Sequence, residues 1–389
     1  MMFLVSDGKG TFECYGSSFY LEPISYPSVN LANILVTEDT LGNRLLSNHE
    51  HFLEAKFEAE KIPGFPSRMT SVESVSMGAK VVVLRGGGIG DLILLLPALR
   101  MLRNRLPKNV KVTLATFCDR FALFEGMDEI DEIITLPARM TNIVGMNYYI
   151  EFSERLDLFG SLHMTDYYLT ILGIDPEKVK PFLKQPDISK RVTKSEKISE
   201  WYRELRRHWK KVIYVNIGAT DIIRRLPPSL ISKVATALPD VAFVVPSEVH
   251  VENRRKPSNV FALETGYSLR AYISAIYYSD GVLSSDSSAY HLAAALNKPA
   301  VALFGPICSK LRSRYYPTVI SLDADYRGQI CSSPCGLNAV TELEQIPGIQ
   351  KYDISKGCPE ANIKKTKYSP CLLSIPLDKI VYALSEILS

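Results

Sequence analysis

Continuous runs of aliphatic and β-branched residues recur along this chain, and each is followed by a turn and a segment of helical pattern. Short runs of this kind are typical of strands that are buried on both faces of a sheet. Their alternation with helices predicts parallel sheets of the α/β class. The runs occupy residues 80–84, 110–115, 130–136, 212–217, 241–245, 281–285 and 300–304.

The runs fall into two series, which predicts two α/β domains. A length of 389 residues is sufficient for two or three domains. We place the first domain at residues 78–190 and the second at residues 212–375. Residues 191–211 are predicted to form a linker helix between them, and residues 376–389 a C-terminal helix.

Residues 1–77 differ in composition from the rest of the chain. They are rich in Tyr, Ser, Gly and Pro and contain only short apolar runs, a pattern that favours β-hairpins. Within this segment, residues 49–61 have a helical pattern. We therefore predict a small β-rich N-terminal extension, whose role does not follow from its residues.

The overall composition limits the class of protein. Hydrophobic residues make up 46% and charged residues 22%, which excludes disordered, collagen-like and coiled-coil chains. The net charge of +3 is too small to indicate binding to nucleic acid. No apolar run approaches the length of a membrane span, and the N-terminus lacks the pattern of a signal peptide, so we expect a cytoplasmic protein.

A basic stretch at residues 184–211 leaves two interpretations open. Glu196, Glu200 and Glu204 lie among its basic residues at i,i+4 spacing, which predicts a helix with surface ion pairs. The charges fit a solvated helix face. They also fit contact with a polyanionic acceptor or an anionic membrane, which would place the protein at the periphery of the inner membrane. The basic residues are Lys190, Arg191, Lys194, Lys197, Arg203, Arg206, Arg207, Lys210 and Lys211.

A glycine-rich loop joins the run at 80–84 to the helix that follows it. Gly87, Gly88 and Gly90 permit a tight turn and close approach of a ligand. The spacing does not match the dinucleotide fingerprint, and the loop lacks the Gly-Lys-Ser/Thr of a phosphate-binding P-loop. Asp91 opens the helix, where it is either an N-terminal capping residue or a carboxylate held ionised for base chemistry.

A serine-rich loop, SSDSSAYH at residues 284–291, joins the run at 281–285 to its helix. Ser287 and Ser288 can donate hydroxyl groups, and the N–H groups of the helix start favour an anion such as a diphosphate. A helix capped by serine without a ligand is the alternative. The loop also contains Asp286 and His291.

The turn after residues 212–217 reads GATDIIRRLP. Gly218 and Thr220 suit a turn that holds phosphate, and the Arg224 guanidinium can bind phosphate oxygens in a bidentate manner. A surface arginine is the alternative for Arg224.

These three segments together resemble glycosyltransferase family 9, the lipopolysaccharide heptosyltransferases. The matching stretches, in the same order as in the family, are GGGIGDLILLLPALRML, GATDIIRRLP and DSSAYHLAAALNKPAVALFGP. The resemblance covers about residues 80–385. It implies a GT-B fold, in which two Rossmann-like domains face each other across a cleft, with the acceptor on the first and the donor on the second.

The resemblance also implies roles for individual residues. Asp91 would be the general base, with Gly87, Gly88 and Gly90 in the loop on the acceptor side. Arg224 and the helix start at Ser287 and Ser288 would stabilise the leaving nucleoside diphosphate. The remaining donor-binding residues would be Gly218, Thr220, Asp286 and His291.

The implied donor is a nucleotide-diphosphate sugar, with an ADP-sugar favoured. The implied acceptor is a glycolipid or saccharide in envelope polysaccharide assembly. The reaction would invert the anomeric centre and need no catalytic metal. Arg224 replaces the usual Lys of the family, Leu226 the usual Trp, and Ser288-Ala289 the usual Gly-Pro, so the resemblance does not imply heptose as the sugar.

Four cysteines, Cys331, Cys335, Cys358 and Cys371, gather near the end of the chain. Four thiolates can bind structural zinc or iron in a tetrahedral site, but the spacing is not that of a pair of zinc knuckles. Disulfides and unpaired thiols are the alternatives. The family often carries cysteines in this region, which explains their presence without assigning a role.

The sequence thus predicts an inverting glycosyltransferase. The alternatives are a non-catalytic protein that binds sugar nucleotides or glycans on the same scaffold, and transfer to a protein or nucleic-acid acceptor, with nucleic acid disfavoured by the charge. The broken glycine fingerprint argues against a nicotinamide-dependent oxidoreductase.

Overall fold

The computed structural model describes residues 1–6, 10–14, 17–21, 31–37, 52–54, 62–152, 161–247, 257–266, 268–336 and 357–389. The chain divides into two compact units. The N-terminal unit comprises Met1–Arg155 and Thr165–Lys180, and the C-terminal unit comprises Leu156–Met164 and Pro181–Ser389. The finer division at residues 77, 190, 211 and 375 stays a prediction.

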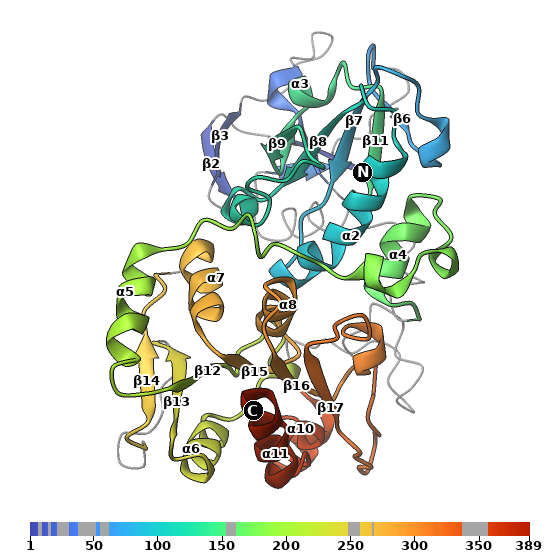
Figure 1. The fold of residues 1–389 in the computed structure, drawn as a ribbon. Helices are drawn as coiled ribbons and strands as arrows, with labels where there is room; N and C mark the ends of the chain where they lie inside the picture. The colour runs from blue at the N-terminus through green and yellow to red at the C-terminus, as the bar shows by residue number, and fades with distance from the viewer. Residues whose placement is uncertain are drawn as a thin grey trace. The chain divides into compact units, whose positions relative to one another are not determined.

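A parallel sheet forms the centre of the N-terminal unit (Figure 1). Its strand order is β6-β11-β7-β8-β9, so the first strand of the α/β series, β7, lies in the middle. Helix α2 (Ile89–Arg105) follows β7, and most of its side chains from Leu92 to Leu102 are buried. The strands are β6 (Ser67–Arg68), β7 (Lys80–Leu84), β8 (Lys111–Thr116), β9 (Glu132–Thr135) and β11 (Tyr148–Glu151).

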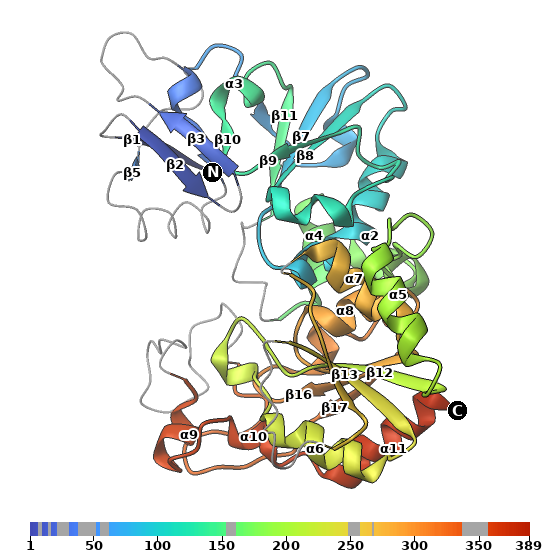
Figure 2. The same ribbon diagram turned by 90° about the vertical axis from the view of Figure 1, so that its left-hand side faces the viewer.

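Antiparallel strands of the N-terminal extension pack beside this sheet, as Figure 2 shows. One sheet has the order β10-β4-β1-β5, and β2 pairs with β3 as a hairpin. Its core is continuous with that of the parallel sheet, because Leu4 and Leu35 belong to the same buried cluster as Val82 and Leu84. The predicted β-rich extension is confirmed. The strands are β1 (Met2–Ser6), β2 (Gly10–Cys14), β3 (Ser17–Leu21), β4 (Leu35–Thr37), β5 (Phe52–Glu54) and β10 (Ala138–Arg139).

The helix predicted from the pattern at residues 49–61 is wrong for the part that the structure describes. Residues Phe52–Glu54 form strand β5, which pairs antiparallel with β1. Pairing with a strand distant in sequence overrides a local helical preference. The rest of 49–61 lies outside the described residues.

The C-terminal unit contains a six-stranded parallel sheet of order β14-β13-β12-β15-β16-β17 (Figure 1). Helices α6 (Pro228–Ala237), α7 (Leu269–Tyr278), α8 (Ser288–Ala295) and α11 (Leu377–Leu388) accompany it. With the N-terminal antiparallel strands, these two Rossmann-like units confirm the predicted α/β class. The strands are β12 (Lys211–Asn216), β13 (Val241–Pro246), β14 (Val260–Leu263), β15 (Gly281–Ser285), β16 (Ala300–Phe304) and β17 (Val319–Asp323).

The predicted linker helix is α5 (Glu196–Leu205), which packs against α7 within the C-terminal unit. Ile198, Tyr202 and Leu205 form its buried stripe, and the Tyr202 hydroxyl donates to the Ala275 carbonyl at 2.7 Å. Its exposed Arg203 and the neighbouring Arg207 pair with glutamates of the same segment. Among the described helices, none combines the length and apolar character needed to cross a membrane.

Candidate functional site

The strand order of the C-terminal sheet indicates where a ligand binds. Strand β12 comes first in the chain, β13 and β14 extend the sheet on one side, and β15, β16 and β17 extend it on the other. The order therefore reverses between β12 and β15. In open parallel sheets, ligands bind beyond the carboxyl ends of the strands at this switch point. The predicted donor turn 218–227 begins two residues after β12, and the serine loop 284–291 includes the last two residues of β15 and continues beyond it.

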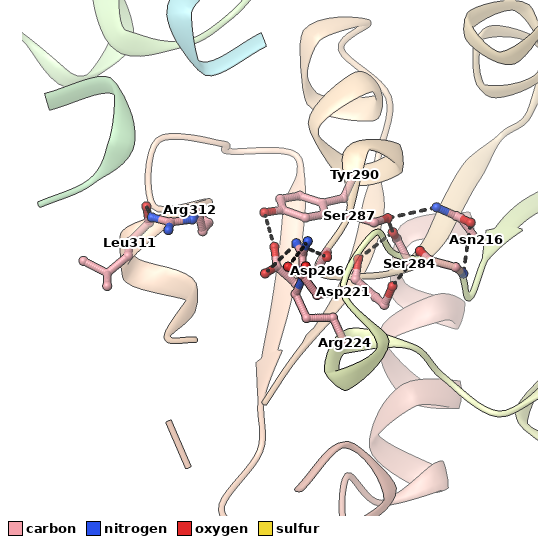
Figure 3. Close-up of polar contacts among 11 residues, drawn as sticks. Asn216, Asp221, Arg224, Ser284, Asp286, Ser287, Tyr290, Leu311 and Arg312 are labelled. Atoms are coloured by element: carbon pink, nitrogen blue, oxygen red, sulfur yellow. Dashed lines mark hydrogen bonds and ion pairs between the residues drawn. The ribbon is translucent and has the colours of Figure 1, made fainter. Parts of the chain in front are cut away.

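Hydrogen bonds join the two loops (Figure 3). The Asn216 side-chain amide donates to the Ser287 hydroxyl at 2.9 Å, and the Ser285 hydroxyl donates to the Gly218 carbonyl at 3.2 Å. The hydroxyls of Ser284 and Ser287 lie 2.9 Å apart, and the side-chain Oδ1 of Asn216 accepts the Gly218 N–H at 3.2 Å. This network of hydrogen bonds holds Gly218 next to the N-terminus of α8.

Arg224 lies at the centre of an ion-pair cluster (Figure 3). Its Nη2 contacts an Asp221 carboxylate oxygen at 2.9 Å. Its Nη1 donates to the Asp286 backbone carbonyl at 2.9 Å and lies 3.4 Å from the Asp286 carboxylate. The structure thus brings Arg224 and Asp286 together, as the donor-site hypothesis requires, and adds Asp221.

A tyrosine in the first turn of α8 holds the Asp286 carboxylate. The Tyr290 hydroxyl donates to Asp286 Oδ1 at 3.0 Å, and burial together with the Asp286 charge raises the pKa of Tyr290 well above its usual value. His291 is buried and shares a 2.7 Å hydrogen bond with the Tyr316 hydroxyl. Burial, Arg312 and Arg224 lower the pKa of His291 well below its usual value, so the imidazole is neutral.

The predicted hydroxyl donors have protein partners in this structure. Ser287 is the N-cap residue of α8, and its hydroxyl accepts from Asn216 rather than from the helix. The Ser288 hydroxyl lies 3.1 Å from that of the buried Tyr272. Thr220 is exposed. The backbone N–H groups at the start of α8 therefore fit a diphosphate better than the hydroxyl of Ser288 does. The donor roles of these residues and of His291 stay predictions.

Sequence reasoning missed Asn216, Asp221, Tyr290 and the buried Arg312. Asn216 carried a signal, because it is a polar residue at the end of a mostly apolar strand, two residues before Gly218. Asp221 lay within a quoted motif, but its pairing with Arg224 depends on the short helical turn Ile222–Arg224, which Asp221 caps.

The N-terminal sheet has its own switch point, between β7 and β11, and the glycine loop follows β7 there. Gly87 has φ of +95°, which favours glycine. Asp91 lies in the first turn of α2 and accepts the Gly88 N–H at 2.9 Å. The buried Arg85 lies 3.8 Å from the Asp91 carboxylate, whose side chain is 34% exposed.

Tyr168 of α4 (Met164–Ile171) contacts this loop. Its hydroxyl donates to the Asp91 backbone carbonyl at 3.3 Å, and the Arg85 guanidinium lies over its ring at 5.7 Å. Because burial raises its pKa, Tyr168 stays protonated and neutral. The Asp91 carboxylate thus caps the helix and is partly exposed, while its role as a general base stays a prediction.

The four clustered cysteines line one cavity of about 10 Å³ in the C-terminal unit. That volume is about the size of one small occupant. Burial and the neighbouring Cys335 and Cys358 raise the pKa of the Cys331 and Cys371 thiols to about 12. Within the described ranges, no three His, Cys, Asp or Glu side chains are gathered as a preformed metal centre.

Glu360 organises the loop that carries Cys331. Its side chain is fully buried and accepts the N–H groups of Gln329 and Ile330 at 2.9 and 3.0 Å, and the Tyr326 hydroxyl at 3.0 Å. Burial alone would raise the pKa of this carboxyl, but these donors outweigh burial and lower it.

The cysteine cavity is also connected to the arginine turn. Ile223, next to Arg224, lines the cavity, and the Ser369 hydroxyl donates to the Ile223 carbonyl at 2.6 Å. Ser369 precedes α10 (Pro370–Leu373), which contains Cys371. The cysteine region thus supports the backbone that positions Arg224.

Part of the chain matches a known protein family. The sequence model of glycosyltransferase family 9 (heptosyltransferase) matches residues 251–329, which include the serine loop. No curated protein matches the chain in sequence.

Three solved structures share the fold at low sequence identity. ADP-heptose lipopolysaccharide heptosyltransferase II from E. coli is 15% identical with a TM-score of 0.55, covering 80% of this chain and 98% of its own. The iron-containing dodecameric glycosyltransferase TibC from enterotoxigenic E. coli is 14% identical with a TM-score of 0.55, covering 86% and 78%. TibC in complex with ADP-D-beta-D-heptose is 12% identical with a TM-score of 0.51, covering 99% and 90%. The fold is therefore that of the GT-B heptosyltransferases.

Proposed function

We propose that this chain, a glycosyltransferase similar to family 9, transfers a sugar from a nucleotide-diphosphate sugar to an acceptor hydroxyl with inversion at the anomeric carbon. The observation that carries the proposal is the ion-pair cluster of Arg224 beyond β12 and β15, where Arg224 and the start of α8 meet at the switch point of the sheet. A guanidinium beside a helix N-terminus suits a diphosphate.

The donor diphosphate binds between the loop at Gly218 and the start of α8. Arg224 stabilises the charge that develops on the leaving phosphate oxygen as the bond to the sugar breaks. The hydrogen bond between Asn216 and Ser287 keeps the two loops in place, so little rearrangement is needed when the donor binds. An ADP-sugar is the favoured donor, since TibC has been solved with ADP-D-beta-D-heptose.

Asp91 acts as the general base. The acceptor oxygen forms a bond to the anomeric carbon, the bond from that carbon to the phosphate oxygen breaks, and the acceptor proton passes to the Asp91 carboxylate. Arg85 and the Gly88 N–H orient the carboxylate. Exposure of the Asp91 side chain leaves it accessible to an acceptor hydroxyl.

The cysteine cluster is proposed to hold a structural zinc or iron ion. The donor set fits the chemistry, because four thiols line one small cavity. Such an ion would displace the protons of these thiols and tie together the loops at Cys331, Cys358 and Cys371. Metal content of the purified protein, with and without Cys358→Ser, tests this proposal. Less than one equivalent in both proteins would contradict it.

The acceptor is proposed to be a glycolipid or saccharide of the cell envelope. Transfer to a protein is the second candidate, and the N-terminal antiparallel sheet favours it. Heptosyltransferase II leaves about a fifth of this chain uncovered, whereas the nucleotide-sugar complex of TibC covers 99% of it. The antiparallel sheet gives the N-terminal unit a surface on which a different acceptor can be selected.

Contact with an anionic membrane stays part of the proposal for a glycolipid acceptor. The ion pairs of α5 and its flank already explain much of the basic segment as a solvated face. Sedimentation with vesicles of anionic and of neutral lipids separates the two interpretations. Binding only to anionic vesicles supports membrane contact, and no binding to either contradicts it.

The experiment that tests the function is a donor screen followed by product analysis. ADP-, GDP- and UDP-sugars are incubated with lipopolysaccharide cores, oligosaccharides and bacterial surface proteins, and release of nucleoside diphosphate is measured with transfer. Proton NMR of the product gives the anomeric configuration. Transfer with inversion that is lost in Asp91→Asn supports the proposal. Tight nucleotide binding without turnover on any acceptor supports the non-catalytic alternative.

A further inference from the structure

Arg224 has two carboxylate partners at a site proposed to receive a diphosphate. One guanidinium faces the charges of Asp221 and Asp286, so the described cluster of these three residues carries a net negative charge. A diphosphate that approaches Arg224 therefore meets repulsion as well as attraction. Displacement of one carboxylate from Arg224 would remove part of this repulsion.

The two carboxylates are held differently. Only 5% of the Asp286 side chain is exposed; Tyr290 donates to one of its oxygens, and Arg224 contacts the other oxygen and its backbone carbonyl. Moving it would leave a buried charge without its partners, which is costly. Asp286 is thus a fixed part of the site that orients Arg224.

Asp221 is held much less firmly. Its side chain is 26% exposed, and its ion pair with Arg224 is a local contact between residues three apart in the sequence. A partly exposed ion pair of this kind contributes little to stability. A rotation of the side chain toward solvent would release Arg224 Nη2 and leave the contacts with Asp286 in place.

We propose that Asp221 is a positioning residue that occupies Arg224 Nη2 in the empty enzyme and is displaced by a phosphate of the nucleoside diphosphate. Its carboxylate takes the place of the ligand's oxygens. It keeps Arg224 pointed at the site while no donor is bound, and it competes with the diphosphate product, which promotes product release. This inference rests on the proposed donor site and adds a competing group to it.

The test is nucleotide affinity measured by calorimetry with ADP, GDP and UDP on the full chain. Asp221→Asn removes the competing charge and keeps the shape of the side chain. We expect about two- to fivefold tighter binding of the preferred nucleotide, the range of one partly exposed charge pair. The gain should shrink as salt is raised from 50 to 500 mM. Under multiple turnover, KM for the donor should fall, and kcat should fall wherever product release limits the rate.

Asp240→Asn is the matched control, because Asp240 is an exposed acid in the turn before β13, at the opposite end of the same sheet. It removes the same charge and should leave nucleotide affinity unchanged. A merely structural role of Asp221 would weaken binding, so weaker or unchanged affinity in Asp221→Asn overturns the inference. If wild type, Asp221→Asn and Asp240→Asn all fail to bind any of the three nucleotides at millimolar concentration, the proposed donor site fails instead.

Discussion

The two parallel sheets of this molecule place opposite charges at equivalent points. Beyond β7, the N-terminal unit presents the Asp91 carboxylate with a buried arginine, Arg85, behind it. Beyond β12 and β15, the C-terminal unit presents the Arg224 guanidinium with a buried carboxylate, Asp286, behind it. The same topology thus presents a carboxylate in one unit and a guanidinium in the other, and local residues decide which.

The difference also shows in how each loop is shaped. The N-terminal loop depends on backbone conformation, with Gly87 at a positive φ and a carboxylate that bonds to its own turn. The C-terminal loops depend on side chains that bond from one loop to the other, such as Asn216 with Ser287. We therefore expect the first loop to be sensitive to backbone changes and the second to changes in polar side chains.

Asp91→Asn should have the largest effect on turnover. The amide keeps the size of the side chain but cannot accept the acceptor proton, so we expect kcat to fall by about 10²- to 10⁴-fold. Nucleotide affinity should stay within about twofold of wild type, because the proposed donor site belongs to the other unit. Initial rates and calorimetry measure the two quantities. Asp128→Asn, an exposed acid of the same unit, is the charge-matched control. Retained turnover would remove Asp91 from the mechanism.

Arg224→Ala should reverse this pattern, because it removes the cation of the donor site. Loss of a charge-assisted hydrogen bond costs about 1.5–3 kcal/mol, so ADP affinity should fall by roughly 10- to 100-fold. Arg224→Lys should recover part of it, since an ammonium keeps the charge but not the fork geometry. Arg207→Ala, an exposed arginine after α5, is the control. Unchanged affinity in Arg224→Ala would show that the diphosphate binds elsewhere.

The sequence contained enough to predict both loops, but not how their side chains pair. Apolar runs and glycine or serine turns are local, so β7, β12, β15 and the loops after them could be read from periodicity. Ser288 was predicted to face the ligand, yet its hydroxyl lies against that of Tyr272, because the start of α8 is also packed against α7.

Pairing over long sequence distances explains the other differences. Strand β10 at residue 138 completes a sheet of the N-terminal extension, and β5 pairs with β1 where a helix was predicted. The contact of Arg224 with Asp286 spans 62 residues. Each of these depends on strand order, which one sequence does not encode in its periodicity.

Alanine substitutions at two glycines, one in each loop, should distinguish the two loops, and their effects should be smaller than those of the changes at Asp91 and Arg224. A Cβ at Gly87 would lie 3.0 Å from Asp91 Oδ2 on a backbone of positive φ, whereas a Cβ at Gly218 would lie 3.4 Å from its nearest neighbour, Asn216 Oδ1. Gly87→Ala should destabilise the N-terminal unit by about 1–2 kcal/mol and lower kcat. Gly218→Ala should leave the stability of the C-terminal unit within experimental error. Denaturant unfolding and rate measurements check this pair, and equal effects of the two changes would contradict the distinction between the loops.

Acidic pH should weaken the C-terminal unit selectively. His163 and His291 are buried there, and burial, followed by the charge of Arg312, lowers both pKa values well below the usual 6.5. Around and below pH 6.5, the two histidines bind protons in the unfolded chain but not in the folded unit. The stability from these groups is therefore complete above pH 6.5 and is lost as pH falls below it, by up to about 1.4 kcal/mol per pH unit for each histidine. The described part of the N-terminal unit contains no histidine.

Hydrogen exchange of peptides from α8 and α2 between pH 7.5 and 5.0, corrected for intrinsic rates, measures the two units separately. Protection of α8 should fall with pH more steeply than that of α2. His291→Gln keeps a polar partner for Tyr316 but has no charge to gain, so it should flatten the slope in α8 by about half. An unchanged slope in this variant would mean that His291 does not titrate on unfolding. The acid sensitivity would then have to arise from His163, whose pKa is lowered by Arg312 and Arg314 after burial.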